Sequence, residues 1–374
     1  MSKAIYAFSG DPITVGHVDV VRRAAKIFEQ VIVAIGVNPD KKYMFSLAER
    51  TEMAEHSLRN FKNVKVVAFT GLLVDFAYEQ GAEVIVKGVR NTQDFEYERY
   101  LNQLGESQKL GIETAVLFAD PKLAHVSSSS VKAIQKEQGL IHEYVSPFVK
   151  QMLEAKISEQ MIVSVTGEIG VGKSFVCEQL VNLGKDCGLK VHHIELDHLA
   201  HDIYETLTDK GYEKVRQQLV AEFGEEIMNV DGTINRKVLG DLVFNDANKL
   251  AALNKIMSTP ILVRLRRELY GKKGLILLNA ALIAESDMAY LSNNNVILVK
   301  ADEKNQVARL QARELSPAQI KTRLASQYDF AKKKKELEKI IKRDASGQLW
   351  QVTSNDEKVL TELKAFLADI NKDC

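Results

Sequence analysis

Hydrophobic positions along the chain alternate between short runs rich in β-branched residues and stretches with helical spacing. In the first half, the apolar runs lie at residues 4–8, 31–37, 64–69, 83–89 and 113–119. Helical patterns lie near residues 17–28, 47–60, 71–82, 94–108, 128–138 and 145–155. Short apolar runs separated by helices are typical of a parallel sheet that is covered on both faces. The pattern therefore predicts an α/β domain.

The polar stretch KISEQ, residues 156–160, interrupts this pattern before a new apolar run, MIVSVT, begins at Met161. We place the domain boundary here, which predicts domains at residues 1–157 and 161–374. Further strands are predicted at about 191–195, 275–279, 296–300 and 349–353. A chain of 374 residues exceeds what one hydrophobic core usually serves, so two domains agree with its length.

Charge and targeting signals exclude several classes of function. Fifty basic residues balance fifty acidic ones, so the chain has no net field to hold nucleic acid or an anionic membrane. The apolar run in MSKAIYAFSG is too short for a signal peptide, and no segment approaches the ~18 apolar residues of a membrane span. We therefore expect a cytoplasmic protein that binds neither nucleic acid nor a membrane.

The sequence GEIGVGKS, residues 167–174, matches the phosphate-loop pattern G-x-x-x-x-G-K-[ST] between a predicted strand and a predicted helix. Its glycines let successive N–H groups point at phosphates, while Lys173 neutralises phosphate oxygens and Ser174 offers a ligand to magnesium. The predicted ATP-binding residues of this loop are Glu168, Ile169, Gly170, Val171, Gly172, Lys173 and Ser174.

Asp197 is a candidate catalytic base, because it follows the predicted strand at 191–195 and should lie beside the phosphate loop. Phosphoryl transfer to an alcohol requires removal of a proton from a weakly acidic hydroxyl, which a nearby carboxylate can accept. The alternative is an aspartate that caps the following helix. Spacing alone favours neither interpretation.

The second half resembles dephospho-CoA kinase, which phosphorylates the 3′-hydroxyl of dephospho-CoA. The resemblance rests on the segments VTGEIGVGKS, ELDHLAHDI, DGTINRKVLGDLVF, ILLNAALIAES and VARLQARELSPAQIKTRLASQ. It implies that Asp197 is the base, that Arg236 lies in a helical substrate region, and that Arg309 and Arg313 belong to a lid-like helix that binds ATP. From spacing alone the two lid arginines also fit a solvated helix face. The basic run 332–335 is interpreted as a solvated helix segment, with contact to substrate phosphates as the alternative.

The stretch SGDPITVGHVDVVRRA, residues 9–24, places His17 directly after a glycine at a predicted helix start. The unpaired N–H groups and positive dipole end of such a helix attract anions and disfavour a protonated imidazole. His17 is therefore a candidate hydrogen-bond donor to an anion. The alternative is a surface histidine near a helix cap.

The first half resembles phosphopantetheine adenylyltransferase of the bacterial type, through AIYAFSGDPITVGHVDVVRRA, NPDKKYMFSLAER, VKGVRNTQDFEYERYLNQL and SSSSVKAI. That family joins 4′-phosphopantetheine to the AMP part of ATP and releases pyrophosphate. The dephospho-CoA so formed is the substrate of the kinase. The two resemblances together imply a Rossmann-like nucleotidyltransferase sheet followed by a P-loop kinase sheet with helical substrate and lid regions.

The resemblance of the first half also implies roles for individual residues, with His17 as the group that stabilises the transition state. The implied ATP-binding residues are Ser9, Gly10, His17, Gly88, Val89, Arg90, Glu98, Ser127, Ser128 and Ser129. The implied phosphopantetheine-binding residues are Ser9, Lys41, Leu73 and Lys87.

Two positions of the first loop differ from this family. Phe8 stands where a glycine is usual, and Gly10 stands where a phenylalanine is usual. The ring of Phe8 could obstruct the approach to the phosphates, or the exchange could simply move one ring across the turn. The sequence leaves both interpretations open.

We therefore expect a bifunctional transferase that catalyses the last two steps of coenzyme A biosynthesis with ATP and Mg²⁺. Its expected partners are ATP, 4′-phosphopantetheine and dephospho-CoA, and a homo-oligomer formed through the first domain is left open. Two alternatives remain. One is an adenylyltransferase and kinase pair of NAD salvage, and the other is a kinase whose first half binds nucleotide without turnover.

Overall fold

The computed structural model describes residues 2–244, 246–354 and 358–371, and the chain divides into two compact units, residues 1–153 and 154–374. The polar stretch that the sequence places between the domains is partly helical. The π-helix η1 (Glu154–Ser158) follows α6 (Pro147–Leu153) without a break, and β6 (Gln160–Thr166) begins shortly afterwards.

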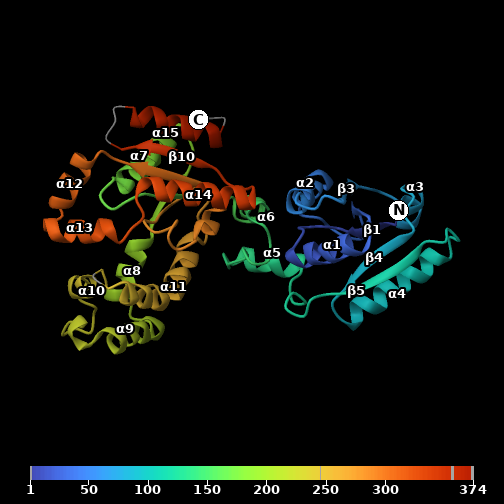
Figure 1. Ribbon diagram of the computed structural model, residues 1–374, viewed down its shortest axis with the longest axis horizontal. Helices are drawn as coiled ribbons and strands as arrows, with labels where there is room; N and C mark the ends of the chain where they lie inside the picture. The colour runs from blue at the N-terminus through green and yellow to red at the C-terminus, as the bar shows by residue number, and fades with distance from the viewer. Residues whose placement is uncertain (1, 245, 355–357, 372–374) are drawn as a thin grey trace. The chain divides into compact units, whose positions relative to one another are not determined.

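Unit 1 is built on a parallel sheet with the strand order β3-β2-β1-β4-β5 (Figure 1). The strands are β1 (Lys3–Phe8), β2 (Gln30–Ile35), β3 (Val64–Ala68), β4 (Val84–Val89) and β5 (Glu113–Phe118). The helices are α1 (Val15–Ile27), α2 (Leu47–Leu58), α3 (Leu73–Glu79), α4 (Thr92–Glu106), α5 (Ser128–Lys136) and α6. The order of the strands reverses direction between β1 and β4, and in open α/β sheets ligands bind where this reversal leaves a crevice.

Unit 2 contains a second parallel sheet, with the order β10-β9-β6-β8-β7. The strands that follow β6 are β7 (Val191–Glu195), β8 (Gly274–Asn279), β9 (Val296–Lys300) and β10 (Leu349–Thr353). Helices α7 (Lys173–Asp186) and α15 (Val359–Ile370) pack against this sheet through a shared apolar cluster. The predicted fold class, two α/β units with parallel sheets, is confirmed.

Helices are present where the sequence predicts substrate and lid regions in the second half. Helices α8 (Leu196–Glu205), α9 (Lys210–Phe223), α10 (Arg236–Val243) and α11 (Ala247–Leu269) enclose a separate apolar cluster and extend from one side of the sheet (Figure 1). Helices α12 (Glu303–Gln311), α13 (Pro317–Ala325) and α14 (Phe330–Asp344) come between β9 and β10. Within the described residues, no helix is long and apolar enough to cross a membrane.

Candidate active sites

A cavity of about 710 Å³ lies at the carboxyl ends of β1 and β4 in unit 1. The residues predicted for this site that line the cavity are Ser9, His17, Lys41, Lys87, Gly88, Arg90, Glu98, Ser127, Ser128 and Ser129. Gly10 and Val89 are buried next to lining residues in the chain. Leu73 begins α3 and packs against an apolar cluster that includes Ile32 and Ala77, and is not among the lining residues.

The imidazole of His17 is held as a neutral hydrogen-bond donor. It lies in the first turn of α1, where Nδ1 accepts the N–H of Thr14 at 3.1 Å and lies 2.9 Å from the Thr14 hydroxyl. An accepting Nδ1 requires the tautomer whose proton is on Nε2. Burial lowers the pKa of His17 to about 4, with the charge of Arg90 as a second cause. The neutrality expected from the helix start is found, although burial is its main cause.

Phe8 forms part of the wall of this cavity. Its ring stacks on the His17 imidazole, with the ring centroids 4.4 Å apart and the planes inclined by 25°. Gly10 has a φ of +61°, and a Cβ atom at that position would lie 3.2 Å from the Phe8 ring. The ring therefore lies over Gly10 and beside the imidazole. A cavity of about 710 Å³ remains with the ring in place, so Phe8 does not fill the site.

Two cations of the cavity, Lys87 and Arg90, are paired with carboxylates. Lys87 Nζ lies 2.6 Å from Glu98 Oε2, and Arg90 Nε lies 2.8 Å from Asp94 Oδ2. Opposite charges at this distance restrain each other's side chains, so the cations are positioned before a ligand arrives.

The serines lie at the start of α5. The Ser127 hydroxyl accepts the N–H of Ser130 at 3.0 Å, and the Ser128 hydroxyl donates to the carbonyl of Pro12 at 2.8 Å. Ser127 is therefore the N-cap residue of α5, and all three serines, Ser127, Ser128 and Ser129, line the cavity. A helix start of this kind offers N–H groups to an anion.

Sequence reasoning missed Asp11 and Lys132, which also line the cavity. The Asp11 carboxylate accepts the N–H groups of Met44 and Phe45, at 3.1 and 3.0 Å, and the Lys132 ammonium at 2.6 Å. Burial acts in the opposite direction, but these hydrogen bonds, that of Lys132 above all, hold the pKa of Asp11 below its usual value. Asp11 thus ties the loop before α2 to helix α5.

Arg50 was also missed, because a single arginine within a helix gives no signal that it is buried. Its side chain is buried, and Nη1 donates to the carbonyl oxygens of Ser9 and Gly36, the latter at 2.8 Å. The guanidinium lies 4.0 Å from the centroid of the Tyr43 ring. Arg50 therefore connects the ends of β1 and β2 with the loop that carries Lys41.

In unit 2, the predicted phosphate loop follows β6 and leads into α7, as the sequence indicates. Gly170 and Gly172 have φ values of +81° and +91°, which favour glycine. The ammonium of Lys173 is turned back onto the loop, where it donates to the carbonyls of Gly167 at 3.2 Å and Glu168 at 3.0 Å. Burial lowers the pKa of Lys173 to about 8, although the charge of Asp197 raises it.

Ser174 meets a carboxylate at the carboxyl end of β7. Its hydroxyl donates to Glu195, whose Oε1 also accepts the side-chain amide of Asn279 at 2.8 Å. Hydrogen bonding with His193 is the main cause that lowers the pKa of Glu195 to about 2. A hydroxyl beside an ionised carboxylate suits Mg²⁺, which is usually bound by one or two carboxylates and substrate phosphates. Within the described ranges, no group of three His, Cys, Asp or Glu side chains forms a metal site.

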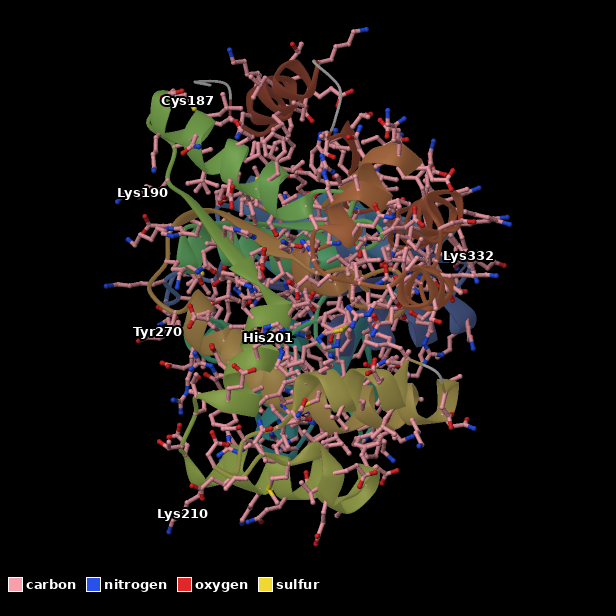
Figure 2. All side chains as sticks on the ribbon, turned by 90° about the vertical axis from the view of Figure 1, so that its left-hand side faces the viewer. Cys187, Lys190, His201, Lys210, Tyr270 and Lys332 are labelled. Carbon is pink, nitrogen blue, oxygen red and sulfur yellow. The ribbon has the colours of Figure 1, made fainter. Side chains whose placement is uncertain are left out.

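Asp197 lies exposed in the first turn of α8, close enough to Lys173 for its charge to affect the lysine's pKa. Glu195 is the N-cap residue of this helix, so the interpretation of Asp197 as the helix cap is wrong. The pKa of His201 is lowered, mainly by burial. The charge of Arg236 lowers this pKa further, whereas the charge of Asp197 raises it. Figure 2 shows His201 where α8 leaves the sheet for the helical region. Asp197 is therefore close enough to act electrostatically on both Lys173 and His201.

The two predicted lid arginines lie on different elements. Arg309 lies in the last turn of α12, and its Nη1 donates to Ser354 Oγ at 2.9 Å and to the carbonyl of Gly170 at 3.4 Å. The interpretation as a solvated helix face is therefore wrong for Arg309. Arg313 lies in the turn that follows α12, where it is exposed and its charge lowers the pKa of Lys173.

Two family models match the chain. Residues 161–348 match the model of dephospho-CoA kinase, and residues 9–134 match the cytidylyltransferase-like model. Similar proteins include the phosphopantetheine adenylyltransferase of Alkaliphilus metalliredigens, 40% identical over 156 residues that make up 42% of this chain and 99% of that protein. The phosphopantetheine adenylyltransferase of Clostridium novyi is 43% identical over 145 residues, which cover 39% of this chain and 90% of that protein.

Among solved structures, a dephospho-CoA kinase from Campylobacter jejuni is 19% identical, with a TM-score of 0.34, and the match covers 57% of this chain and 99% of that chain.

Proposed function

This chain belongs to the dephospho-CoA kinase and phosphopantetheine adenylyltransferase families, and we propose how its two sites divide the work. The chain is a bifunctional transferase that catalyses the last two steps of coenzyme A biosynthesis. Residues 1–157 join 4′-phosphopantetheine to AMP from ATP, and residues 161–374 phosphorylate the product at its 3′-hydroxyl. The observation that supports this division is a difference between the sites. A carboxylate, Asp197, stands near the phosphate loop of unit 2, whereas the unit 1 cavity presents a neutral donor, His17.

The first reaction needs no general base. The nucleophile is a phosphate whose second pKa is about 6, so it is already an anion near pH 7. The barrier comes from repulsion between anions and from charge that builds on the α-phosphate, which positioned donors and cations reduce. The Nε2–H of His17 is the donor to the α-phosphate in this proposal, and its neutral state leaves Nδ1 free to accept the Thr14 N–H.

The remaining residues of unit 1 bind the two substrates. Lys41 and Lys87 hold the phosphate of phosphopantetheine, while Arg90 and the start of α5 hold the outer phosphates of ATP. Ser9 contacts both substrates, and Glu98 orients the nucleotide. Gly10, Leu73, Gly88 and Val89 complete the proposed binding residues, on the resemblance described above. The support from geometry is that Ser9, Lys41, Lys87, Arg90 and Glu98 line one cavity.

In the second reaction, Asp197 accepts the proton of the 3′-hydroxyl while that oxygen attacks the γ-phosphate, and the bond from the γ-phosphorus to the bridging oxygen breaks, which releases ADP. The loop from Glu168 to Ser174 binds the phosphates through its N–H groups and the Lys173 ammonium, and Arg309 and Arg313 neutralise charge from the lid side. A divalent metal is general to these families, and we propose Mg²⁺, held by the hydroxyl of Ser174 with Glu195 beside it. When bound, the ion would neutralise charge on the outer phosphates.

We place the protein in the cytoplasm, with ATP, 4′-phosphopantetheine and dephospho-CoA as its partners. Analysis of products tests the whole proposal: the chain is mixed with phosphopantetheine, ATP and Mg²⁺, and dephospho-CoA, CoA and pyrophosphate are measured. We expect CoA and pyrophosphate from the unmodified chain. His17→Ala should lose pyrophosphate release yet convert added dephospho-CoA, whereas Asp197→Asn should accumulate dephospho-CoA.

Two results would contradict the proposal. Turnover of nicotinamide mononucleotide in place of phosphopantetheine would support an enzyme of NAD salvage. Binding of ATP to unit 1 without any pyrophosphate release would support a first half that does not catalyse adenylyl transfer.

A further inference from the structure

Lys333, on helix α14, is a buried cation that the mechanism above does not use. The sequence predicts a solvated helix segment at 332–335, and this prediction is wrong for Lys333, whose side chain is 0% exposed. Its neighbour Lys332 is exposed and lies at the surface of unit 2 (Figure 2). Because lysine is rarely buried without a partner, the contacts of Lys333 indicate what it does.

The ammonium of Lys333 anchors the segment 327–329, which joins the lid helix α13 to α14. Nζ donates to Glu285 Oε1 at 2.5 Å and to the carbonyl of Ala281 at 2.7 Å. The same carboxylate oxygen accepts the N–H of Tyr328 at 2.9 Å. A buried ion pair therefore fixes the backbone of this segment against the chain that follows β8.

Gln327, the residue before Tyr328, contacts the phosphate loop. Its Oε1 accepts the N–H of Ile169 at 3.0 Å. The carbonyl of Ile169 accepts the side-chain amide of Gln306, on α12, at 2.9 Å. Two residues from the lid side therefore hold the backbone of Ile169, at the start of the loop whose later N–H groups bind phosphates in the proposed function.

We propose that Lys333 and Glu285 are positioning residues of the kinase site: their ion pair fixes Tyr328 so that Gln327 keeps Ile169 in the loop conformation that binds ATP. This inference rests on the proposed phosphate-binding role of that loop. Net stability is a poor explanation for the pair, because a buried ion pair is often no more stabilising than well-packed apolar residues. Fixing a loop before its ligand arrives lowers the ordering cost of binding.

The kinase step, assayed with added dephospho-CoA and no phosphopantetheine, tests the proposal through Lys333→Met. If the competent loop falls to about a tenth of the population, the apparent dissociation constant for ATP rises about tenfold. We expect this rise in KM for ATP, with a smaller change in kcat. Gln327→Leu removes the acceptor of the Ile169 N–H without touching the ion pair, and should act in the same direction.

The double variant Lys333→Met/Gln327→Leu shows whether Lys333 acts through Gln327. Residues that act through one contact have non-additive effects, so the double variant should raise KM little more than the larger single change. Fully additive effects would overturn the proposal. Lys335→Met, an exposed lysine on the same helix, is the matched control and should keep the KM of the unmodified chain.

A second pair of measurements separates positioning from stability, because Lys333→Met leaves the Glu285 carboxylate buried without its cation and could unfold unit 2. In Lys333→Met/Glu285→Leu both charges are gone. We expect the thermal unfolding temperature to recover while KM for ATP stays raised, since the loss of Glu285 removes the acceptor of the Tyr328 N–H. Recovery of both quantities would mean a purely structural role and would overturn the proposal.

Failure of the unmodified chain to phosphorylate dephospho-CoA would refute the proposed function instead. The positioning role is then tested by equilibrium binding of ATP, which needs no turnover, with Lys173→Met defining the contribution of the unit 1 site. Unchanged ATP affinity of unit 2 in Lys333→Met would overturn the inference.

Discussion

The ring of Phe8 stacks on the imidazole of His17, with the two ring centroids 4.4 Å apart. Phe8 comes from the end of β1 and His17 from the first turn of α1, so the stack joins the two elements that flank the turn at residues 9–14. The contact excludes water from one face of the imidazole. It thereby contributes to the burial that keeps His17 neutral.

Phe8→Ala should slow adenylyl transfer, because the imidazole loses the surface that fixes its orientation. Small misplacement of a catalytic group can cost up to about a hundredfold in rate, so we expect kcat to fall between about tenfold and a hundredfold, with little change in KM for ATP. Phe8→Tyr keeps the ring and should retain most of the activity. An alanine variant that is faster than the unmodified chain would mean that the ring obstructs the site.

The pKa of His17, about 4, predicts how the stability of unit 1 depends on pH. An unfolded chain binds the proton near pH 6.5, whereas the folded chain resists it until about pH 4. The free energy of unfolding should therefore be fully retained above pH 6.5 and fall as the pH decreases from 6.5 towards 4. Denaturation of the unmodified chain and of His17→Gln, at pH 7.5 and pH 5, measures this effect.

The glutamine variant offers a side-chain oxygen to the Thr14 N–H but does not titrate, so its loss of stability over this range should be smaller. Nitrogen NMR of the imidazole gives the pKa directly. An His17 that titrates near pH 6.5 would contradict both the burial argument and the neutral donor in the mechanism.

Binding of ATP to unit 2 should take up protons at alkaline pH. The pKa of Lys173 is about 8 without ligand, so part of the ammonium is deprotonated at pH 8.5. Phosphates beside the amine favour its charged form and raise that pKa. Calorimetry in two buffers of different ionisation enthalpy should show proton uptake at pH 8.5 and little at pH 7. Lys173→Met removes the effect, and an equal proton count at both pH values in the unmodified chain would contradict it.

The parts of the structure that sequence predicts best are those fixed by local patterns. Strands β8 (Gly274–Asn279) and β9 (Val296–Lys300) lie where short apolar runs place them, because buried parallel strands need apolar side chains on both faces. The phosphate loop is predicted for a similar reason. Its glycines are required locally, because Gly170 and Gly172 have φ values of +81° and +91°.

What sequence does not predict are pairings between residues far apart in the chain. Lys333 belongs to a run of lysines whose local pattern is that of a solvated helix, and only the fold brings Glu285 to it. Asp11 and Lys132 meet in the same way across unit 1. Arg313 was expected on a helix with Arg309, but α12 ends at Gln311. The spacing of four residues therefore does not place the two arginines on one face of a helix.

Arg50 offers a test of how far the unit 1 cavity depends on a residue outside it. In Arg50→Met the apolar stem remains, but the partly buried carbonyls of Ser9 and Gly36 lose their Arg50 donor, at a cost of at most about 1–3 kcal/mol for each unsatisfied group. The ring of Tyr43 also loses its cation, so the loop that carries Lys41 is less well fixed. We therefore expect the unfolding transition of unit 1 to move to lower temperature and KM for phosphopantetheine to rise.

Phosphorylation of added dephospho-CoA by the Arg50→Met chain should be unchanged. Arg59 is an exposed arginine at the end of the same helix, and Arg59→Met should leave both activities unchanged. A kinase step that weakens in parallel would show that the substitution acts on the whole chain and would contradict a local role for Arg50.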